Sequence, residues 1–204
     1  MLLKSILITS VILLSYLVFF GQSNFPYYQE WKLIDSLMLK KNLPKSALIE
    51  VNKVYAAAKK DKQEVQWVKA IIYRNHLQES NDQNINDKIK NLESEITSAP
   101  LRVAALLKSI EAEELFQYLQ GHRYQFRNRI PMIADTSSDI TTWTINRFID
   151  KISNLYLASL DNPDVLKKTP LENFNAVLIS GNSRELRPSL FDLLAWRALD
   201  YFRL

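Results

Sequence analysis

Hydrophobic residues recur at helical spacing over residues 31–60, and this segment predicts two helices joined by a short turn. Trp31, Ile34 and Met38 follow an i, i+3, i+7 pattern, so they share one face of the first helix. Pro44 disfavours helical backbone at the residue before it and suits the first turn of a new helix. The apolar face of the second helix consists of Ala47, Leu48, Val51, Val54, Tyr55 and Ala58. The pair cannot bury both faces alone, so it needs neighbouring helices.

The rest of the chain repeats this pattern. Apolar positions at helical spacing predict six further helices, over residues 62–78, 85–97, 100–120, 140–160, 170–179 and 188–204. Gly121 and Gly181 follow the ends of two of these segments, where glycine supplies a left-handed C-terminal cap. Periodicity is lost between residues 122 and 138, which we expect to form a long ordered loop. Ser138 or Asp139 is the expected N-cap of the helix that follows this loop.

We therefore predict an all-α protein of about eight helices, arranged as a stack of antiparallel helical hairpins. The spacing of Trp31, Ile34 and Ala47 is that of the tetratricopeptide repeat, in which an alanine follows the tryptophan by sixteen residues. Asp35 stands where that repeat has a glycine, and the later helix pairs match it loosely. The predicted domain is a tetratricopeptide-like α-α superhelix over residues 24–204.

Residues 1–23 have the pattern of a signal peptide. Lys4 provides a positive charge, Ile6–Phe20 is an apolar core of 15 residues, and Gly21, Gln22 and Ser23 form a cleavage site with small residues. We expect an exported protein whose mature chain begins at Asn24. The alternative is an uncleaved membrane anchor, although a spanning helix needs about 20 apolar residues.

Composition narrows the possible functions. The 204 residues carry a net charge of +4 and include no cysteine, which excludes disulfides, thiolate metal sites and a cysteine nucleophile. The three glycines are too far apart for a phosphate-binding loop, and the chain has neither an HExxH nor a GxSxG motif. The sequence predicts no cofactor and no metal. In an exported protein of mild charge we also expect no nucleic-acid partner.

Three acids on the fifth predicted helix are candidates for catalysis: Glu111, Glu113 and Glu114. Two neighbouring carboxylates carry out acid–base chemistry in glycosidases, so a glycan-acting hydrolase of the cell envelope is the alternative to a non-enzymatic function. A helix of mixed charge also places such acids on a solvated face, and we favour that interpretation. The two histidines, His76 and His122, lie near predicted helix ends, where a structural or surface role is expected.

The segment from Tyr118 to Arg129 interleaves arginines with aromatic residues. Its candidate partner-binding residues are Arg123, Tyr124, Phe126 and Arg127. Such residues bind anionic polymers through charge and stacking, and they also recur at protein interfaces. In the structural alternative, which we favour, the arginines pair with acids of a neighbouring helix while the aromatic side chains anchor the loop.

The last predicted helix is apolar around nearly its whole circumference. Its large apolar residues are Leu190, Phe191, Leu193, Leu194, Trp196, Leu199, Tyr201, Phe202 and Leu204. One apolar stripe covers about 100° or somewhat more of a helix, so these residues cannot share one buried face. We expect Leu190, Leu194 and Ala198 to pack inward. Trp196, Tyr201 and Phe202 are then left uncovered as a partner-binding face.

Three stretches of the chain resemble one family. They are EWKLIDSLMLKKNLPKSALIEVNKVYAAAKK (30–60), TWTINRFIDKISNLYLASLDNP (142–163) and PLENFNAVLISGNSRELRPSLFDLLAWRALDYF (170–202). Together they look like the N-terminal helical region of large bacterial alpha-2-macroglobulin-like proteins. In that family the helical region precedes a long series of macroglobulin domains, and the full proteins trap peptidases in the cell envelope.

The resemblance implies an exported helical scaffold in the periplasm or cell envelope of a Gram-negative bacterium. Its partner would be a protein, either a following macroglobulin-like domain or another envelope protein. The membrane would be involved only through residues 1–23, if these stay uncleaved. The 204 residues hold no macroglobulin domain, no bait region and no cysteine for a thioester, so no catalytic or trapping residue is carried over.

Overall fold

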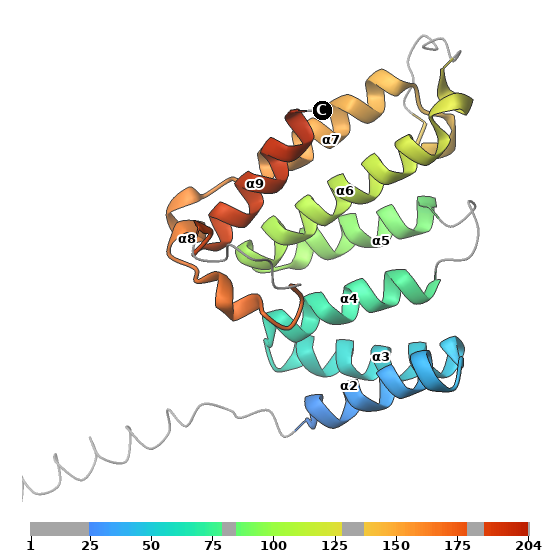
Figure 1. Ribbon diagram of the computed structural model, residues 1–204, viewed down its shortest axis with the longest axis vertical. Helices are drawn as coiled ribbons and strands as arrows, with labels where there is room; N and C mark the ends of the chain where they lie inside the picture. The colour runs from blue at the N-terminus through green and yellow to red at the C-terminus, as the bar shows by residue number, and fades with distance from the viewer. Residues whose placement is uncertain (1–24, 79–84, 128–136, 179–185, 204) are drawn as a thin grey trace, which may run out of the picture.

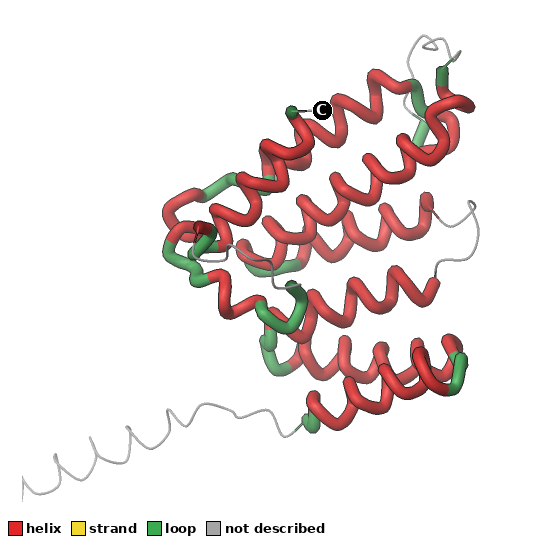
Figure 2. Tube along the Cα trace, viewed as in Figure 1, coloured by secondary structure: helices red, strands yellow, loops and turns green. Residues whose placement is uncertain are grey.

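The computed structural model describes residues 25–78, 85–127, 137–178 and 186–203. Within these ranges the all-α prediction is confirmed, since they contain eight α-helices and no strand (Figure 2). The one isolated β-bridge among them joins Pro170 to Ser189. The predicted signal peptide and Gly181 lie outside the described residues.

The N-terminal hairpin has the predicted turn. Helix α2 spans Tyr27–Asp35 and continues as a π-helical turn over Ser36–Lys40, and α3 spans Pro44–Lys60 with its proline in the first turn. Asn42 has a φ of 51°, a left-handed conformation that asparagine tolerates, and this residue reverses the chain between the helices. Trp31 is buried in a cluster with Val51.

Three longer helices follow in order. Helix α4 spans Glu64–Gln78, α5 spans Ile85–Ser98 and α6 spans Leu101–Phe126. The turns between α3 and α4 and between α5 and α6 are short, so each pair is antiparallel (Figure 1). The first two helices agree with the sequence-based prediction within two residues.

The predicted end of α6 is wrong. Gly121 does not cap the helix, because α6 continues through it to Phe126, and residues 122–126 are helical rather than part of a loop. The physical reason is packing: Phe126 is fully buried and its ring lies 5.0 Å from that of Phe148. That apolar contact outweighs the low helix propensity of glycine. The predicted loop falls largely on residues 128–136, which lie outside the described residues.

The segment predicted as one helix over residues 140–160 is divided. Asp139 caps a 3-10 turn over Ile140–Thr142, and α7 spans Ile145–Ala158 with Thr144 as its N-cap. The side-chain oxygens of these caps accept the backbone N–H groups of Thr141 (3.0 Å) and Arg147 (3.3 Å). Asp139 therefore serves as a cap, as expected, but not of the long helix.

The region from 163 to 178 also differs from the prediction. A short helix α8, Pro163–Lys167, was not predicted, and Pro170 is followed by a 3-10 turn over Leu171–Phe174 instead of an α-helix. The cause is a pair of long-range backbone hydrogen bonds. Leu171 donates to the carbonyl of Pro188 (2.9 Å), and Leu190 donates to that of Thr169 (2.9 Å). These bonds hold the backbone extended just before α9, Leu190–Phe202.

The helices α2 to α7 lie side by side in chain order, and α9 lies against α6, α7 and α8 (Figure 1). One large apolar cluster joins α4, α5, α6, α7 and α9, and a smaller one joins α2, α3 and α4. This order places α9 at one end of the stack.

Candidate interaction surface

Helix α9 is fixed at its start and along one face. Its capping box is complete, since the Ser189 hydroxyl accepts the Asp192 N–H (3.3 Å) and the Asp192 carboxylate accepts the Ser189 N–H (3.0 Å). The predicted inward residues, Leu190, Leu194 and Ala198, are all buried, which confirms that part of the prediction. These contacts determine which residues of α9 face outward.

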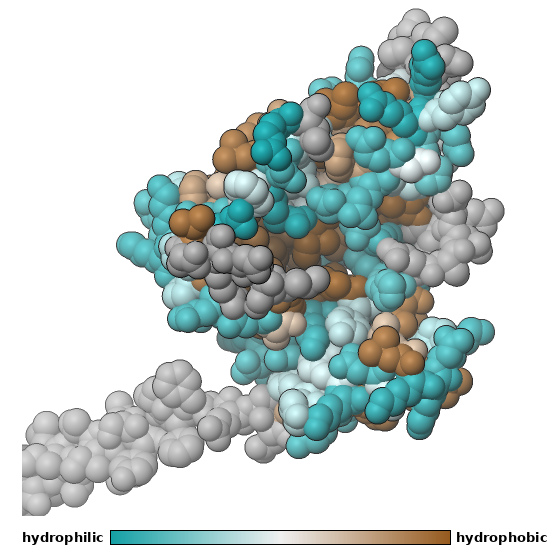
Figure 3. Space-filling model, in the orientation of Figure 1, coloured by the Kyte–Doolittle hydropathy of each residue, from teal (hydrophilic) through white to brown (hydrophobic). Residues whose placement is uncertain are grey.

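The outward residues Trp196, Leu199 and Phe202 form an exposed apolar face, called here the α9 outer face. Their exposed fractions are 45%, 65% and 50%. Together with Asp200 and Arg203 they line an open hollow of about 410 Å³. Figure 3 shows hydrophobic residues at the surface in the region where Figure 1 places α9 and α7. An apolar face of this kind on a capped helix is a feature of interaction sites.

Cationic side chains border the α9 outer face. The guanidinium of Arg187 lies 4.0 Å from the centre of the Trp196 ring, in a cation–π contact. Arg203 donates a hydrogen bond to Asp200 (3.0 Å) and is largely exposed. The rim therefore has a positive group at Arg187 and a paired charge at Arg203.

Tyr201 does not belong to the uncovered face. It is half-buried, its ring stacks on Tyr156 at 5.1 Å and meets the edge of Phe116 at 5.3 Å, and its hydroxyl lies 3.5 Å from that of Ser153. These neighbours come from α6 and α7. Tyr201 thus packs α9 onto the stack, and the expectation that it is uncovered is wrong.

The arginine–aromatic segment forms the last turns of α6. Arg123, Tyr124 and Arg127 are exposed, with Tyr124 89% exposed, whereas Phe126 is buried and unavailable to a partner. Helix α9 reaches α6 at Phe116, about two turns before Arg123. The structure therefore keeps the two predicted groups of interaction residues apart.

The three acids of α6 point to three different partners. Glu111 lies 3.4 Å from the Lys151 ammonium on α7, and Glu114 lies 2.6 Å from that of Lys88 on α5. Glu113 accepts the hydroxyl of Tyr156 (3.0 Å), and the Arg197 guanidinium is 3.7 Å away. The carboxylates join α6 to its neighbours instead of facing one another across a cleft.

Glu111 has the most perturbed titration of these acids. Burial raises the pKa of its carboxyl from 4.5 to about 7, and the nearby Lys151 ammonium opposes that rise. Burial also raises the pKa of the Tyr156 hydroxyl, and the negative charge of Glu113 adds to this effect. Both groups are held inside the helix stack, where Glu111 lies beside the Lys151 ammonium and the neutral Tyr156 hydroxyl donates to Glu113.

Two features of the structure were missed from the sequence. Leu199 stands three residues after Trp196, so helical spacing alone would have put it on the same face. Asn75 is a buried polar residue among the apolar positions of α4, and that interruption was the available signal.

Comparison with protein families, with curated proteins and with solved structures finds no match. The resemblance to alpha-2-macroglobulin-like proteins remains a prediction from the sequence. Within the described residues, no helix combines the length and the apolar character needed to cross a membrane.

Proposed function

We propose that this protein is a non-enzymatic helical interaction module in which the α9 outer face docks another protein. The observation that carries the proposal is the exposure of Trp196, Leu199 and Phe202 on a helix whose opposite face is fully buried. A helix held this firmly presents its outer side chains at little entropic cost. Rigid aromatic anchors of this kind contribute most to binding at protein interfaces.

The order of the helices supports a scaffold function. Stacking of helices in chain order is typical of a tetratricopeptide-like superhelix, and such a superhelix offers extended surfaces to partners. The signal-peptide pattern of residues 1–23 supports a location of this scaffold in the periplasm or cell envelope. In this proposal it corresponds to the N-terminal helical region of an alpha-2-macroglobulin-like peptidase trap.

The proposed occupant of the α9 outer face is a folded protein domain. Its matching surface would present an apolar patch with an acidic group at the edge, because Arg187 sits at the rim over Trp196. The family resemblance favours a macroglobulin-like domain over an unrelated envelope protein.

A second candidate function is an adaptor for anionic polymers. It is favoured by the exposure of Arg123, Tyr124 and Arg127 on the last turns of α6. The glycan hydrolase alternative has less support, because the acids Glu111, Glu113 and Glu114 are each engaged with a cation or a hydroxyl of a neighbouring helix.

Replacing both Trp196 and Phe202 by serine tests the main proposal. An uncovered apolar face promotes self-association of the isolated chain, so wild type should form oligomers that the double variant loses. The free energy of unfolding should change by less than about 1 kcal/mol, because both side chains are already about half exposed. Sedimentation velocity and urea unfolding give the two readouts.

The matched control replaces Leu39 and Ile49 by serine, since both are exposed apolar residues far from α9 in the chain. This control should associate like wild type. A double α9 variant that unfolds would contradict the proposal, and so would a control that also becomes monomeric.

A further inference from the structure

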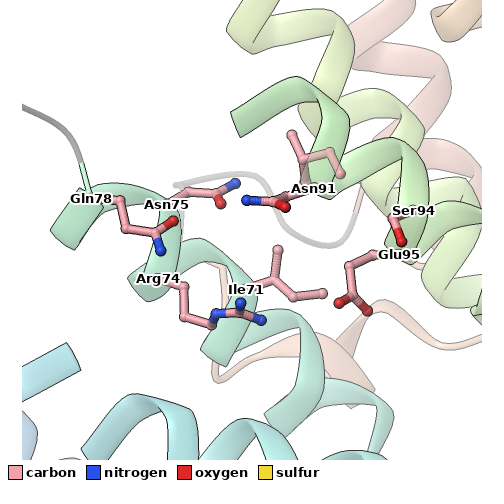
Figure 4. Close-up of a pocket in the computed structure, with 8 residues that line it drawn as sticks. Ile71, Arg74, Asn75, Gln78, Asn91, Ser94 and Glu95 are labelled. Atoms are coloured by element: carbon pink, nitrogen blue, oxygen red, sulfur yellow. The ribbon is translucent and has the colours of Figure 1, made fainter. Parts of the chain in front are cut away.

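A small polar pocket lies between α4 and α5, at a distance from the α9 outer face (Figures 1 and 4). Its cavity volume is about 60 Å³. Helix α4 contributes Arg74, Asn75 and Gln78, and α5 contributes Asn91, Ser94 and Glu95. In Figure 4 the amide groups of Asn75 and Asn91 point toward one another across the pocket.

Two of the residues that line this pocket, Arg74 and Asn75, each carry a buried donor with no hydrogen-bond partner. Asn75 is only 7% exposed, and its side-chain nitrogen Nδ2 makes no hydrogen bond. The Nε of Arg74 is likewise buried without a hydrogen-bond partner. Buried polar groups are nearly always paired, so two adjacent unpaired donors in one pocket indicate a missing acceptor.

The acid in the pocket is already engaged by its own neighbours. Glu95 accepts the indole N–H of Trp67 (3.1 Å) and the ammonium of Lys59 (3.3 Å), and it also accepts the hydroxyl of Tyr55. Arg74 lies with its guanidinium 4.4 Å from the centre of the Tyr55 ring. The Lys59 charge compensates that of Glu95, which leaves the positive charge of Arg74 available to a ligand.

We propose that the α4–α5 pocket binds a carboxylate through Arg74 and Asn75. Both unpaired groups are donors, and an ionised carboxylate offers two oxygens that only accept. Guanidinium–carboxylate hydrogen bonds are among the strongest in proteins. The stacking of Arg74 on Tyr55 holds the guanidinium in place before the ligand arrives.

The side chains around the pocket suit a ligand with more than one polar group. Gln78 and Asn91 carry amides that donate and accept, and Ser94 carries a hydroxyl. Two sources supply such a carboxylate: an acidic side chain of a bound peptide segment, or a small free organic acid. This site is independent of the proposed function of α9, since neither needs the other.

Binding is tested on the full chain with sodium acetate as the probe, by isothermal titration calorimetry at constant ionic strength set with sodium chloride. Wild type should bind acetate saturably. Asn75→Leu keeps a similar volume and removes the unpaired donor, so it should stay folded and bind at least about tenfold more weakly. Arg74→Lys, which keeps the charge but loses Nε, should weaken binding similarly. Arg102→Lys is the matched control, because Arg102 pairs with Glu64 outside the pocket.

A second titration separates the two sources. The tripeptide acetyl-Ala-Glu-Ala-amide carries one side-chain carboxylate, and acetyl-Ala-Gln-Ala-amide carries none. Tighter binding of the glutamate peptide than of acetate identifies an acidic segment, and equal or tighter binding of acetate identifies a small acid. The assignment is wrong, and the pocket holds only solvent, if neither probe binds detectably in the sodium chloride buffer. The same conclusion follows if both pocket variants bind the probes like wild type.

Discussion

Trp31 shows how one large side chain joins three helices. Its indole N–H donates to the side-chain carbonyl of Gln66 (2.6 Å), and its ring lies 4.8 Å from that of Tyr73, both on α4. Lys69 of the same helix places its ammonium 4.1 Å from the ring. Val51 of α3 packs in the same apolar cluster. The Trp31 side chain therefore anchors α2 to both α3 and α4.

We expect Trp31→Ala to lower the free energy of unfolding by about 3–5 kcal/mol, because it removes a large buried ring from a packed cluster. Trp31→Phe keeps part of the ring contact and should cost less. Urea unfolding followed by circular dichroism measures both. A loss below about 1 kcal/mol in the alanine variant would mean that the hairpin does not depend on this contact.

Glu111 illustrates a residue that disfavours the folded state at neutral pH. Its pKa is about 7 when folded, above its usual value of 4.5, so the folded state binds the proton more tightly. The stabilisation that this tighter proton binding gives the folded state is fully present below pH 4.5 and is lost as the pH rises through about 7. This difference between the two pKa values corresponds to about 3 kcal/mol.

The variant Glu111→Gln is neutral at every pH and should remove this dependence. Near pH 4 it should be about as stable as wild type, and near pH 8 it should be more stable by up to about 3 kcal/mol. The readout is the difference in free energy of unfolding between the two proteins across that range. A difference that stays constant with pH would show that Glu111 does not titrate in this window.

At the scale of the element, α6 owes its length to contacts made at its far end. Gly121 lies in the helix interior, and no glycine within the described residues has a positive φ. A Cβ built on Gly121 meets nothing within 4 Å. Glycine therefore contributes flexibility here and no required conformation.

Gly121→Ala should raise the free energy of unfolding by about 0.5–1 kcal/mol, since alanine favours the helix and clashes with nothing. Thermal unfolding monitored by circular dichroism checks the sign. The opposite outcome, a destabilised protein, is what a left-handed cap at this residue would produce.

At the scale of the whole molecule, prediction from sequence succeeded where packing is local. Helix α3 was predictable because its apolar stripe and Pro44 act within a few residues of each other. The turn after Pro170 was not, because it depends on hydrogen bonds to the chain beside Ser189. The inward position of Tyr201, in contrast, was available from helical spacing, because this residue follows Leu194 by seven positions and Ala198 by three.

The two candidate sites also differ in whether local sequence or contacts between helices determine them. Inward and outward faces of α9 follow from its own periodicity, which explains why Leu194 and Trp196 were placed correctly. The pocket that holds Arg74 and Asn75 could not be predicted, because it exists only where α5 lies opposite α4. Whether a donor finds an acceptor depends on the side chains that neighbouring helices bring to it, and the sequence of one helix does not reveal these tertiary contacts.

The stacking of helices in chain order also has a consequence for how the protein folds. Contacts between neighbouring helices close short loops, which favours fast folding. Helix α9 is different, since the hydrogen bond from Arg197 to Ser109 (2.7 Å) joins residues 88 positions apart. Closing a longer loop costs more entropy, so we expect α9 to dock last.

Pulsed hydrogen exchange during refolding should protect the amides of α3 and α4 before those of α9, and simultaneous protection would contradict this order. The α9 outer face would then be presented only by chains whose remaining helices have already assembled.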